Sequence, residues 1–130
     1  MITKQNLKDM LMTIGYKRKT QFLYEKRYPV YDCTIQVDFN AHGTIRYPEE
    51  KGMRIGNHST CNFSNNENFV VLECVTRLMD MGYRPEHIEL EKAWTLGHDT
   101  KGGRADICVY GPDEKTLFIV ECKTAGQKYK

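Results

Sequence analysis

Residues 103–126 read GRADICVYGPDEKTLFIVECKTAG, and this stretch holds two apolar runs separated by a turn. The first run, ICVY, follows Asp106, and the second, LFIV, is followed directly by Glu121, Cys122 and Lys123. The intervening GPDEK contains the glycine, proline and aspartate that favour a tight turn. We therefore predict two antiparallel central strands, covered on both faces, with charged residues at one end of the pair.

The period of a strand indicates where these charged side chains point. Residues two apart share a face, so Glu121 and Lys123 project together while Cys122 points to the opposite face and into the core. Antiparallel pairing places the start of the first strand beside the end of the second, which brings Asp106 to the same edge. We predict that the carboxylates of Asp106 and Glu121 lie within about 6 Å of each other, a distance that one hard cation can bridge.

Two carboxylates this close repel each other unless positive charge lies between them, and Lys123 and a metal ion are the available cations. Oxygen ligands select Mg²⁺ or Mn²⁺. A metal held by Asp106 and Glu121 suits phosphodiester hydrolysis, because it polarises a phosphate oxygen and lowers the pKa of a bound water. Lys123 would orient the water or stabilise the developing charge. The alternative is a strand-end ion pair of Glu121 with Lys123 and a turn-capping Asp106.

The rest of the chain predicts an α/β fold in which a mixed sheet is packed against a helix. The strongest helical pattern spans 65–82, with a broad apolar face and Gly82 at its end. Ser64 or Asn65 can cap it, and Ser64 and Glu67 have the spacing of a capping box. The other expected elements are an N-terminal helix capped by Thr3 and ended by Gly15, a β-hairpin around Tyr28 and Pro29, a short strand within 44–47, and a strand that begins near 87.

Composition sets the class of protein. A chain of 130 residues is expected to form one domain, and a net charge of +2 is far from the strongly basic balance of a dedicated nucleic-acid binder. No apolar window is long enough for a membrane span, and the N-terminus lacks the order of a signal peptide, so we expect a cytoplasmic protein. The five cysteines show no C-x-x-C spacing, which indicates free thiols rather than a zinc or redox site.

The acid, the hairpin and the Glu121-Cys122-Lys123 sequence together resemble the PD-(D/E)XK nuclease superfamily, which has the restriction-endonuclease-like fold. The resemblance implies that Asp106 and Glu121 are metal ligands, that the Cys122 backbone carbonyl is a further ligand, and that Lys123 is the catalytic lysine. The superfamily also commonly draws a glutamate from a preceding helix. Glu67, in the first turn of the predicted helix, is the best match.

Other residues are weaker candidates for the site. Glu73 competes with Glu67 but lies two turns deeper and nearly half a turn around the helix. Lys101 and Arg104 lead into the Asp106 strand and are candidates for contact with a DNA phosphate, or else belong to a solvated connection. Gln127 matches a polar residue that supports the site in some relatives.

The resemblance narrows further over residues 65–124. The succession of a helix, GY, a strand with acidic residues, ADI and ECK is similar to the N-terminal nuclease region of type I restriction enzymes and of restriction–modification proteins fused to an N6-adenine methylase. Ala105 stands where the superfamily name has proline. The implied activity is a Mg²⁺-dependent endonuclease, with Mn²⁺ as an alternative ion. The implied partners are double-stranded DNA and other domains or subunits of a restriction–modification enzyme.

We expect a single nuclease-like domain over 1–130, with 65–130 as its core and 1–64 as an added N-terminal region of unassigned role. Folds of this type normally continue after the lysine strand, so we expect a piece of a larger polypeptide or a short stand-alone relative. A second copy in a homodimer could supply the missing elements. Two other functions stay open. One is a non-catalytic DNA-binding or scaffold module on a degenerate nuclease fold, and the other is a repair-type nuclease.

Overall fold

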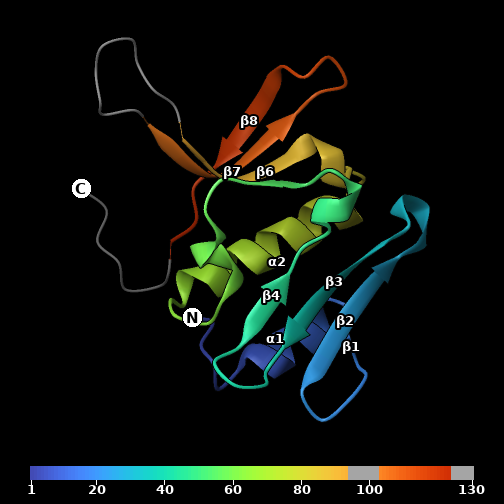
Figure 1. Cartoon of the computed structure of the whole chain (residues 1–130), viewed down its shortest axis with the longest axis vertical. Helices are drawn as coiled ribbons and strands as arrows, with labels where there is room; N and C mark the ends of the chain where they lie inside the picture. The colour runs from blue at the N-terminus through green and yellow to red at the C-terminus, as the bar shows by residue number, and fades with distance from the viewer. Residues whose placement is uncertain (94–102, 124–130) are drawn as a thin grey trace.

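The computed structural model describes residues 1–93 and 103–123, which form two α-helices and two four-stranded sheets (Figure 1). The first sheet has the strand order β1-β2-β3-β4 and the second β5-β6-β7-β8. In chain order the elements are α1 (Leu7–Thr13), β1 (Lys17–Arg18), β2 (Leu23–Tyr28), β3 (Cys33–Asp38), β4 (Thr44–Arg46), β5 (Arg54–Ile55), α2 (Glu67–Asp80), β6 (Ile88–Ala93), β7 (Arg104–Tyr110) and β8 (Thr116–Val120), with short 3₁₀ helices at Pro29–Tyr31, Glu49–Lys51, His58–Cys61 and Pro85–His87.

The N-terminal sheet is antiparallel throughout and contains the predicted hairpin. β2 and β3 pair from Tyr28 opposite Cys33 outward, across the short 3₁₀ turn. In β3 the side chains of Cys33, Ile35 and Val37 are buried and alternate with polar, half-buried neighbours, so one face packs inward and the other meets solvent. The predicted α/β class with an N-terminal helix and hairpin is confirmed.

The second sheet is mixed, because β5 runs parallel to β6 while β6, β7 and β8 are antiparallel. The predicted β7–β8 hairpin is confirmed, with Ile107 paired to Val120. The prediction that both strands are covered on both faces is wrong for β8. Leu117 and Ile119 are 57% and 47% exposed, because β8 is an edge strand and packs against the core only through Phe118 and Val120.

Helix α2 packs against both sheets and carries much of the core. Its buried apolar side chains join those of β3, β6 and β7 in one cluster. Of the two predicted caps, Asn65 is the one whose side chain accepts the Glu67 N–H, at 2.9 Å. The Ser64–Glu67 capping box is wrong, since the Ser64 hydroxyl donates to Asn62 instead. The predicted Thr3 cap is also wrong. Helix α1 begins at Leu7, and the Thr3 N–H donates to the Asn6 side chain instead.

A buried polar network ties the N-terminal sheet and the loop after α1 to helix α2. The Tyr16 hydroxyl lies 2.9 Å from the Thr76 hydroxyl, and the Tyr28 hydroxyl donates to the Thr76 carbonyl at 3.1 Å. The Thr76 hydroxyl also donates to the Leu72 carbonyl at 2.8 Å. Burial raises the pKa of Tyr16 and Tyr28, so both phenols stay neutral and can donate.

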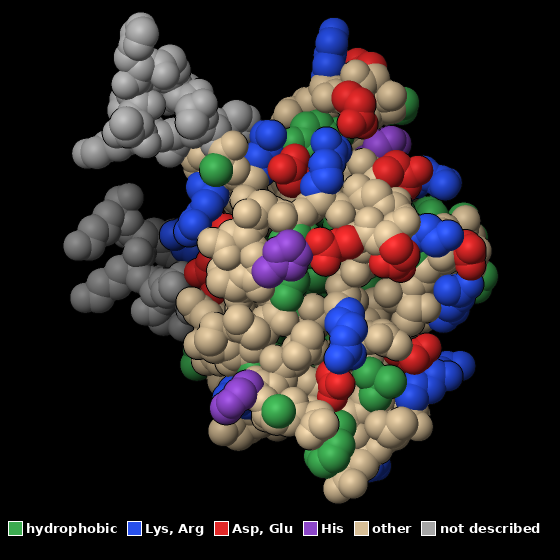
Figure 2. Space-filling view, viewed as in Figure 1, with side chains coloured by type: hydrophobic (Ala, Val, Ile, Leu, Met, Phe, Trp, Pro, Cys, Tyr) green, Lys and Arg blue, Asp and Glu red, His purple; other side chains and the backbone are tan. Residues whose placement is uncertain are grey.

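The surface visible in Figure 2 is mainly polar and charged, with apolar side chains appearing in small groups. Of the helices that the structure describes, neither combines the length and the apolar character that crossing a bilayer requires. The five cysteines are free thiols, three of them buried and two, Cys61 and Cys74, half-buried.

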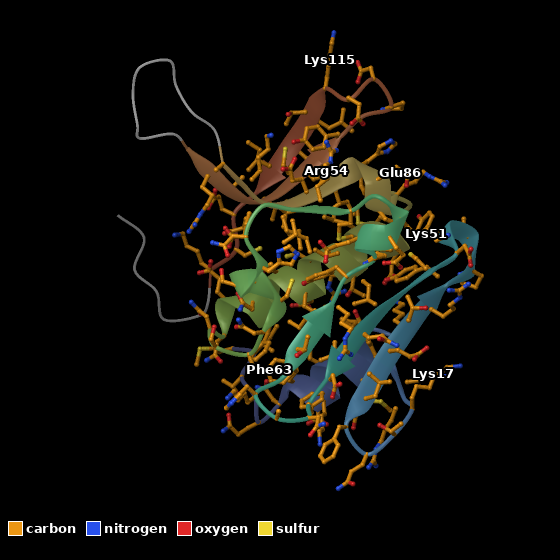
Figure 3. All side chains as sticks on the ribbon, viewed as in Figure 1. Lys17, Lys51, Arg54, Phe63, Glu86 and Lys115 are labelled. Carbon is orange, nitrogen blue, oxygen red and sulfur yellow. The ribbon has the colours of Figure 1, made fainter. Side chains whose placement is uncertain are left out.

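Gly43 and Gly82 provide a matched test of packing at the N-terminal sheet. Both have positive φ, +87° and +108°, but a Cβ at Gly43 would lie 2.3 Å from the Phe63 ring, whereas a Cβ at Gly82 would contact nothing within 4 Å. Phe63, labelled in Figure 3, is locked between the rings of Phe39 and Phe69 at 5.2 Å from each.

We expect Gly82→Ala to lower the free energy of unfolding by about 1 kcal/mol, the cost of strained φ alone, and Gly43→Ala to lower it by roughly 2–4 kcal/mol, because overpacking is added. Urea denaturation of the two variants measures the difference. Equal losses would show that Phe63 moves aside freely.

Candidate active site

The start of β7 and the segment after β8 are joined by a hydrogen bond from a backbone N–H to a carboxylate. Asp106, half-buried in β7, accepts the Cys122 N–H through Oδ2 at 2.7 Å. Because Ile107 pairs with Val120, the next pair in register is Asp106 opposite Glu121, although β8 itself ends at Val120. The carboxylate therefore takes the place of a ladder carbonyl and holds the Glu-Cys-Lys segment against β7.

Cys122 attaches this segment to helix α2. Its side chain is 3% exposed and lies within the core, as predicted, with its Sγ 3.9 Å from the Sγ of Cys74 on α2. The hydrogen bond that it donates to Cys74, together with burial, raises the pKa of the Cys122 thiol, so the thiol stays protonated. Glu121 and Lys123, on either side of Cys122, are exposed.

The helical phase of α2 favours Glu67 over Glu73 as the glutamate near this edge. Glu67 and Cys74 are seven residues apart and share a helix face, and Cys74 is the residue that contacts Cys122. Glu73 instead binds Arg77 at 2.8 and 3.0 Å. The charge of Glu67 also contributes to raising the pKa values of Cys122 and Glu91.

Glu91 in β6 is a carboxylate that the sequence analysis missed. The pairing of Leu90 with Ile107 and of Lys92 with Ala105 places Glu91 level with Asp106. Glu91, Asp106 and Glu121 thus occupy one line across three neighbouring strands, which we call the carboxylate row. The side chain of Glu91 is only 14% exposed.

The electrostatic surroundings of Glu91 are those of a crowded acidic site. Burial is the largest cause of the raised pKa of Glu91. The negative charges of Asp106, Glu67 and Glu121 also raise this pKa, whereas the positive charge of Arg104 lowers it. Arg104 Nε lies 3.1 Å from Oε2 of Glu91, but the pair lacks hydrogen-bond geometry, and this buried oxygen has no hydrogen-bond partner within the described ranges.

The backbone around Glu91 explains how its carboxylate reaches this position. Glu91 has φ +53°, in the left-handed region that non-glycine residues rarely adopt within a strand. Gly56, just after β5, donates its N–H to the Leu90 carbonyl at 2.8 Å, and a Cβ there would lie 2.2 Å from the Glu91 carbonyl. The strand alternation of Ile88 and Leu90 could have indicated the face that Glu91 occupies. Only the register across β7 identifies its neighbours.

The candidate ligand atoms of the site are of the type that a hard divalent cation prefers. The candidate ligands are carboxylates and the Cys122 backbone carbonyl, and such oxygens suit Mg²⁺ or Mn²⁺. Across residues 1–93 and 103–123, no three His, Cys, Asp or Glu side chains are close enough together to hold a metal as they stand. A Mg²⁺ site does not need three, because this ion usually keeps several waters and binds through one or two carboxylates. The convergence of Asp106 and Glu121 on one cation stays a prediction.

The remaining predicted site residues divide into two groups. Arg104 lies at the start of β7, where it pairs with Glu91 and remains largely exposed. Its contact with DNA is untested and stays a prediction. Lys101 and Gln127 lie outside the described residues.

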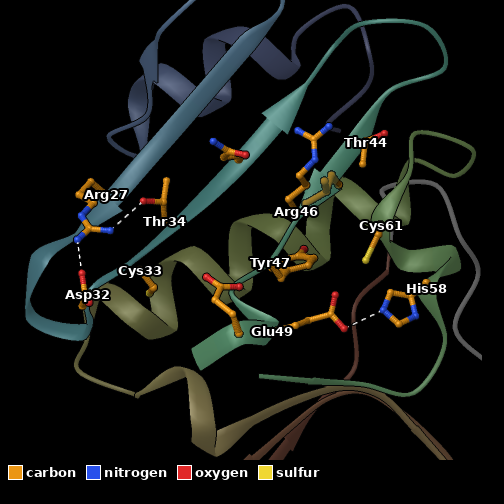
Figure 4. Close-up of a pocket in the computed structure, with 13 residues that line it drawn as sticks. Arg27, Asp32, Cys33, Thr34, Thr44, Arg46, Tyr47, Glu49, His58 and Cys61 are labelled. Carbon is orange, nitrogen blue, oxygen red and sulfur yellow. Dashed lines mark hydrogen bonds and ion pairs between the residues drawn. The ribbon is translucent and has the colours of Figure 1, made fainter. Parts of the chain in front are cut away.

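A cavity on the N-terminal sheet is separate from the carboxylate row. It measures about 560 Å³ and lies on the N-terminal sheet beside the segment that carries Glu49, His58 and Cys61 (Figure 4). His58 and Glu49 are 2.9 Å apart, which with Cys61 gives the residue types of a nucleophilic site. Burial raises the pKa of Cys61 to about 11, so this thiol is not activated.

Comparison with known proteins gives one match. Residues 66–130 match the family described as the type I restriction enzyme R protein N terminus. Neither the curated proteins nor the solved structures contain a match to the chain.

The hydrogen bond from the Cys122 N–H to Asp106 is expected to stabilise the fold. Two substitutions distinguish the contribution of this hydrogen bond from that of the Asp106 charge. We expect Asp106→Ala to lower the free energy of unfolding by roughly 1–3 kcal/mol, because the Cys122 N–H loses its partner in a buried setting. Asp106→Asn keeps an oxygen acceptor and should lose much less. Urea denaturation without metal compares the two, and equal losses would show that the hydrogen bond contributes nothing.

Glu91 should make stability depend on pH. Its pKa is raised above the ordinary 4.5, so the folded state favours the protonated form and ionisation destabilises the fold. We expect Glu91→Gln to raise the melting temperature at pH 7 without metal, and the gain to disappear as the pH falls below about 4.5. Glu73→Gln, which removes an ion pair with Arg77, is the control and should give no gain. An effect of Glu91→Gln that is equal at pH 4 and pH 7 would contradict the raised pKa.

Proposed function

Because the chain belongs to the family of the type I restriction enzyme R protein N terminus, we propose that it is the DNA-cleaving nuclease domain of a restriction–modification system. Its substrate would be double-stranded DNA and its reaction the metal-dependent hydrolysis of a phosphodiester bond inside the duplex. The other subunits or domains of such an enzyme would choose the target sequence, which accords with a family defined by one part of a larger assembly.

The observation that carries this proposal is the hydrogen bond from the Cys122 N–H to Asp106. It holds the Glu-Cys-Lys segment against the acid of the neighbouring strand, which is the arrangement expected of a PD-(D/E)XK site. A pair of ordinary strand-end charges would not need this contact. The hairpin β7–β8 and the adjacent helix α2 also agree with a restriction-endonuclease-like core, which we include in the proposal.

Mg²⁺, or Mn²⁺ in its place, would be held by Asp106 and Glu121, with the Cys122 carbonyl and Glu67 completing or supporting its shell. When bound, the ion would polarise a phosphate oxygen and acidify a water molecule. Because Asp106 Oδ2 already accepts the Cys122 N–H, its Oδ1 is the oxygen left for the cation. Lys123 would place its ammonium group beside the phosphate and stabilise the negative charge that develops there.

Electrostatics gives the metal a second role in this proposal. Glu67, Glu91, Asp106 and Glu121 act on one another closely enough for three of them to raise the pKa of the fourth, Glu91. A DNA phosphate that approaches this edge is therefore repelled until a cation neutralises the carboxylates. Arg104, paired with Glu91, offsets part of the repulsion. Metal would thus be needed for productive DNA approach as well as for cleavage.

Two other functions can be distinguished from the proposed endonuclease by testing supercoiled and linear DNA as substrates. A non-catalytic DNA-binding module would leave supercoiled plasmid intact with Mg²⁺ or Mn²⁺ under all conditions. A repair-type nuclease that acts on ends would degrade linear DNA and spare closed circles. The proposed endonuclease would nick or linearise closed circles, and EDTA would stop it.

Lys123→Ala should abolish cleavage of supercoiled plasmid while the protein stays folded, since the side chain is exposed and contributes little to the core. We expect a loss of at least about 100-fold in rate, the usual range for removing a group that stabilises transition-state charge. Lys115→Ala, at the exposed β7–β8 turn, is the matched control and should cleave normally.

The measurement is gel electrophoresis of plasmid with Mg²⁺, Mn²⁺ or EDTA, with the chain tested in its parent enzyme where it has one. Full activity of Lys123→Ala would rule out this site as the centre of cleavage. Activity that survives EDTA would rule out the metal.

A further inference from the structure

The two halves of the chain carry opposite net charge. Residues 1–64 contain 10 Lys and Arg against 6 Asp and Glu, whereas residues 65–130 contain 9 against 11. The first part therefore has a net charge of +4 and the second, which holds the carboxylate row, of −2. Such an asymmetry points to a polyanionic partner that the basic part attracts. The acidic part that matches the restriction family is poorly suited to retain DNA by itself.

One face of the N-terminal sheet carries more cations than anions. The register places Lys17, Glu25, Gln36 and Arg46 in one line across all four strands. These residues alternate with buried ones such as Tyr24 and Val37, so they lie on the face turned away from the core. We call this the outer face. Its polar members are Lys17, Lys19, Glu25, Arg27, Thr34, Gln36, Asp38, Thr44 and Arg46.

We propose that the outer face binds the sugar-phosphate backbone of duplex DNA, with Lys17 and Lys19 as its principal phosphate contacts. This inference rests on the proposed function, because it supplies the DNA affinity that the acidic nuclease part lacks. Figures 1 and 2 show the same side of the molecule, with β2, β3 and β4 in front of α1, so the outer face is the one turned toward the viewer.

Lys17 and Lys19 differ from the neighbouring Lys26 and Arg27 in forming no ion pair in the described part of the chain, although the register places Glu25 opposite Lys17. Both are exposed, and within the described residues neither ammonium group has an ion-pair or hydrogen-bond partner. Their neighbours are engaged, since Lys26 binds Asp80 and Arg27 binds Asp32. An unpaired lysine attracts a phosphate without first giving up an existing ion pair, so these two offer the largest electrostatic gain.

The shape of the surface suits a strand of phosphates. Lys17 and Lys19 line a concavity of about 330 Å³ together with Lys26 and Arg27, at the end of the sheet where Figure 3 labels Lys17. Beyond it, Arg46 and the wider cavity of Figure 4 continue across β3 and β4. The smaller concavity has Glu25 as its one acidic lining residue, whereas Asp32, Glu49 and Glu50 also line the wider cavity. The phosphate contacts are therefore placed in the smaller concavity, where cations outnumber anions.

The uncharged members of the outer face favour DNA over an acidic protein. Thr34, Gln36 and Thr44 are neutral hydrogen-bond donors, the residue types that commonly contact phosphate and sugar oxygens. A stable protein interface needs aromatic or aliphatic anchors at its centre, and Leu23, half-buried, is the one apolar side chain that the strands present here.

The test measures DNA binding by the full chain in EDTA, which separates it from cleavage. A fluorescein-labelled duplex of 30 base pairs is titrated with protein at several KCl concentrations, and binding is followed by fluorescence anisotropy. The variant Lys17→Gln/Lys19→Gln is compared with the control Lys4→Gln/Lys115→Gln, which removes the same charge from exposed positions off the outer face. Thermal melts check that both variants are folded.

We expect the Lys17/Lys19 variant to bind DNA about tenfold or more weakly at 50 mM KCl, and its slope of log affinity against log salt to fall by about two. The control should keep the wild-type slope. Equal losses in both variants, no loss in either, or no DNA binding by the wild type would overturn the proposal. Labelled poly-glutamate, a mimic of an acidic protein, is titrated in the same way. If the Lys17/Lys19 variant loses binding to poly-glutamate but keeps binding to DNA, the face recognises acidic protein and the proposal is wrong. Intact DNA binding without cleavage in Mg²⁺ would refute the nuclease function alone.

Discussion

The candidate site depends on the hydrogen bond between the Asp106 carboxylate and the Cys122 N–H. β8 ends at Val120, so without this bond the following segment would have no ladder partner to hold it against β7. Cys122 is held on both sides, because its N–H binds Asp106 on β7 and its side chain is buried against Cys74 on α2. These two contacts fix the segment between β7 and α2, and the exposed Glu121 and Lys123 on either side are positioned as a consequence. A side chain that helps hold the backbone is thus also a proposed ligand of the metal.

Burial and the neighbouring carboxylates both oppose the ionisation of Glu91 at this edge of the sheet, and burial is the larger cause. Glu91 is half-buried, lies among other acids and adopts a left-handed backbone beside the Gly56 N–H that binds the Leu90 carbonyl. A chain selected for stability alone would be expected to avoid this combination, because the raised pKa means that ionisation opposes folding. The proposed cation would reverse the sign of the effect, since it would be attracted to the ionised carboxylates and would bind the folded arrangement alone. The cost of the apo site is consistent with a site built for a cation.

Helix α2 links the two parts of the molecule. On the side of the N-terminal sheet it accepts hydrogen bonds from Tyr28 and lies beside Tyr16 through Thr76. On the side of the second sheet it contacts Cys122 through Cys74. The N-terminal sheet therefore shares its core with the family region that begins at residue 66. Because both sheets pack on one rigid helix, a DNA-binding outer face would hold its ligand at a fixed position relative to the carboxylate row.

The sequence by itself determined the fold class, the β7–β8 hairpin, helix α2 and the inward direction of Cys122, because these follow from strand and helix periodicity and from turn residues. It did not determine the helix caps, since Asn65 and Ser64 compete for neighbouring donors and acceptors and only geometry decides between them. It also missed Glu91, because strand alternation shows the face of a side chain but not its neighbours across the sheet. Register, a tertiary property, placed Glu91 level with Asp106. It likewise aligned Lys17 with Arg46 across the N-terminal sheet, because strand pairing joins residues whose separation in the chain carries no periodic signal.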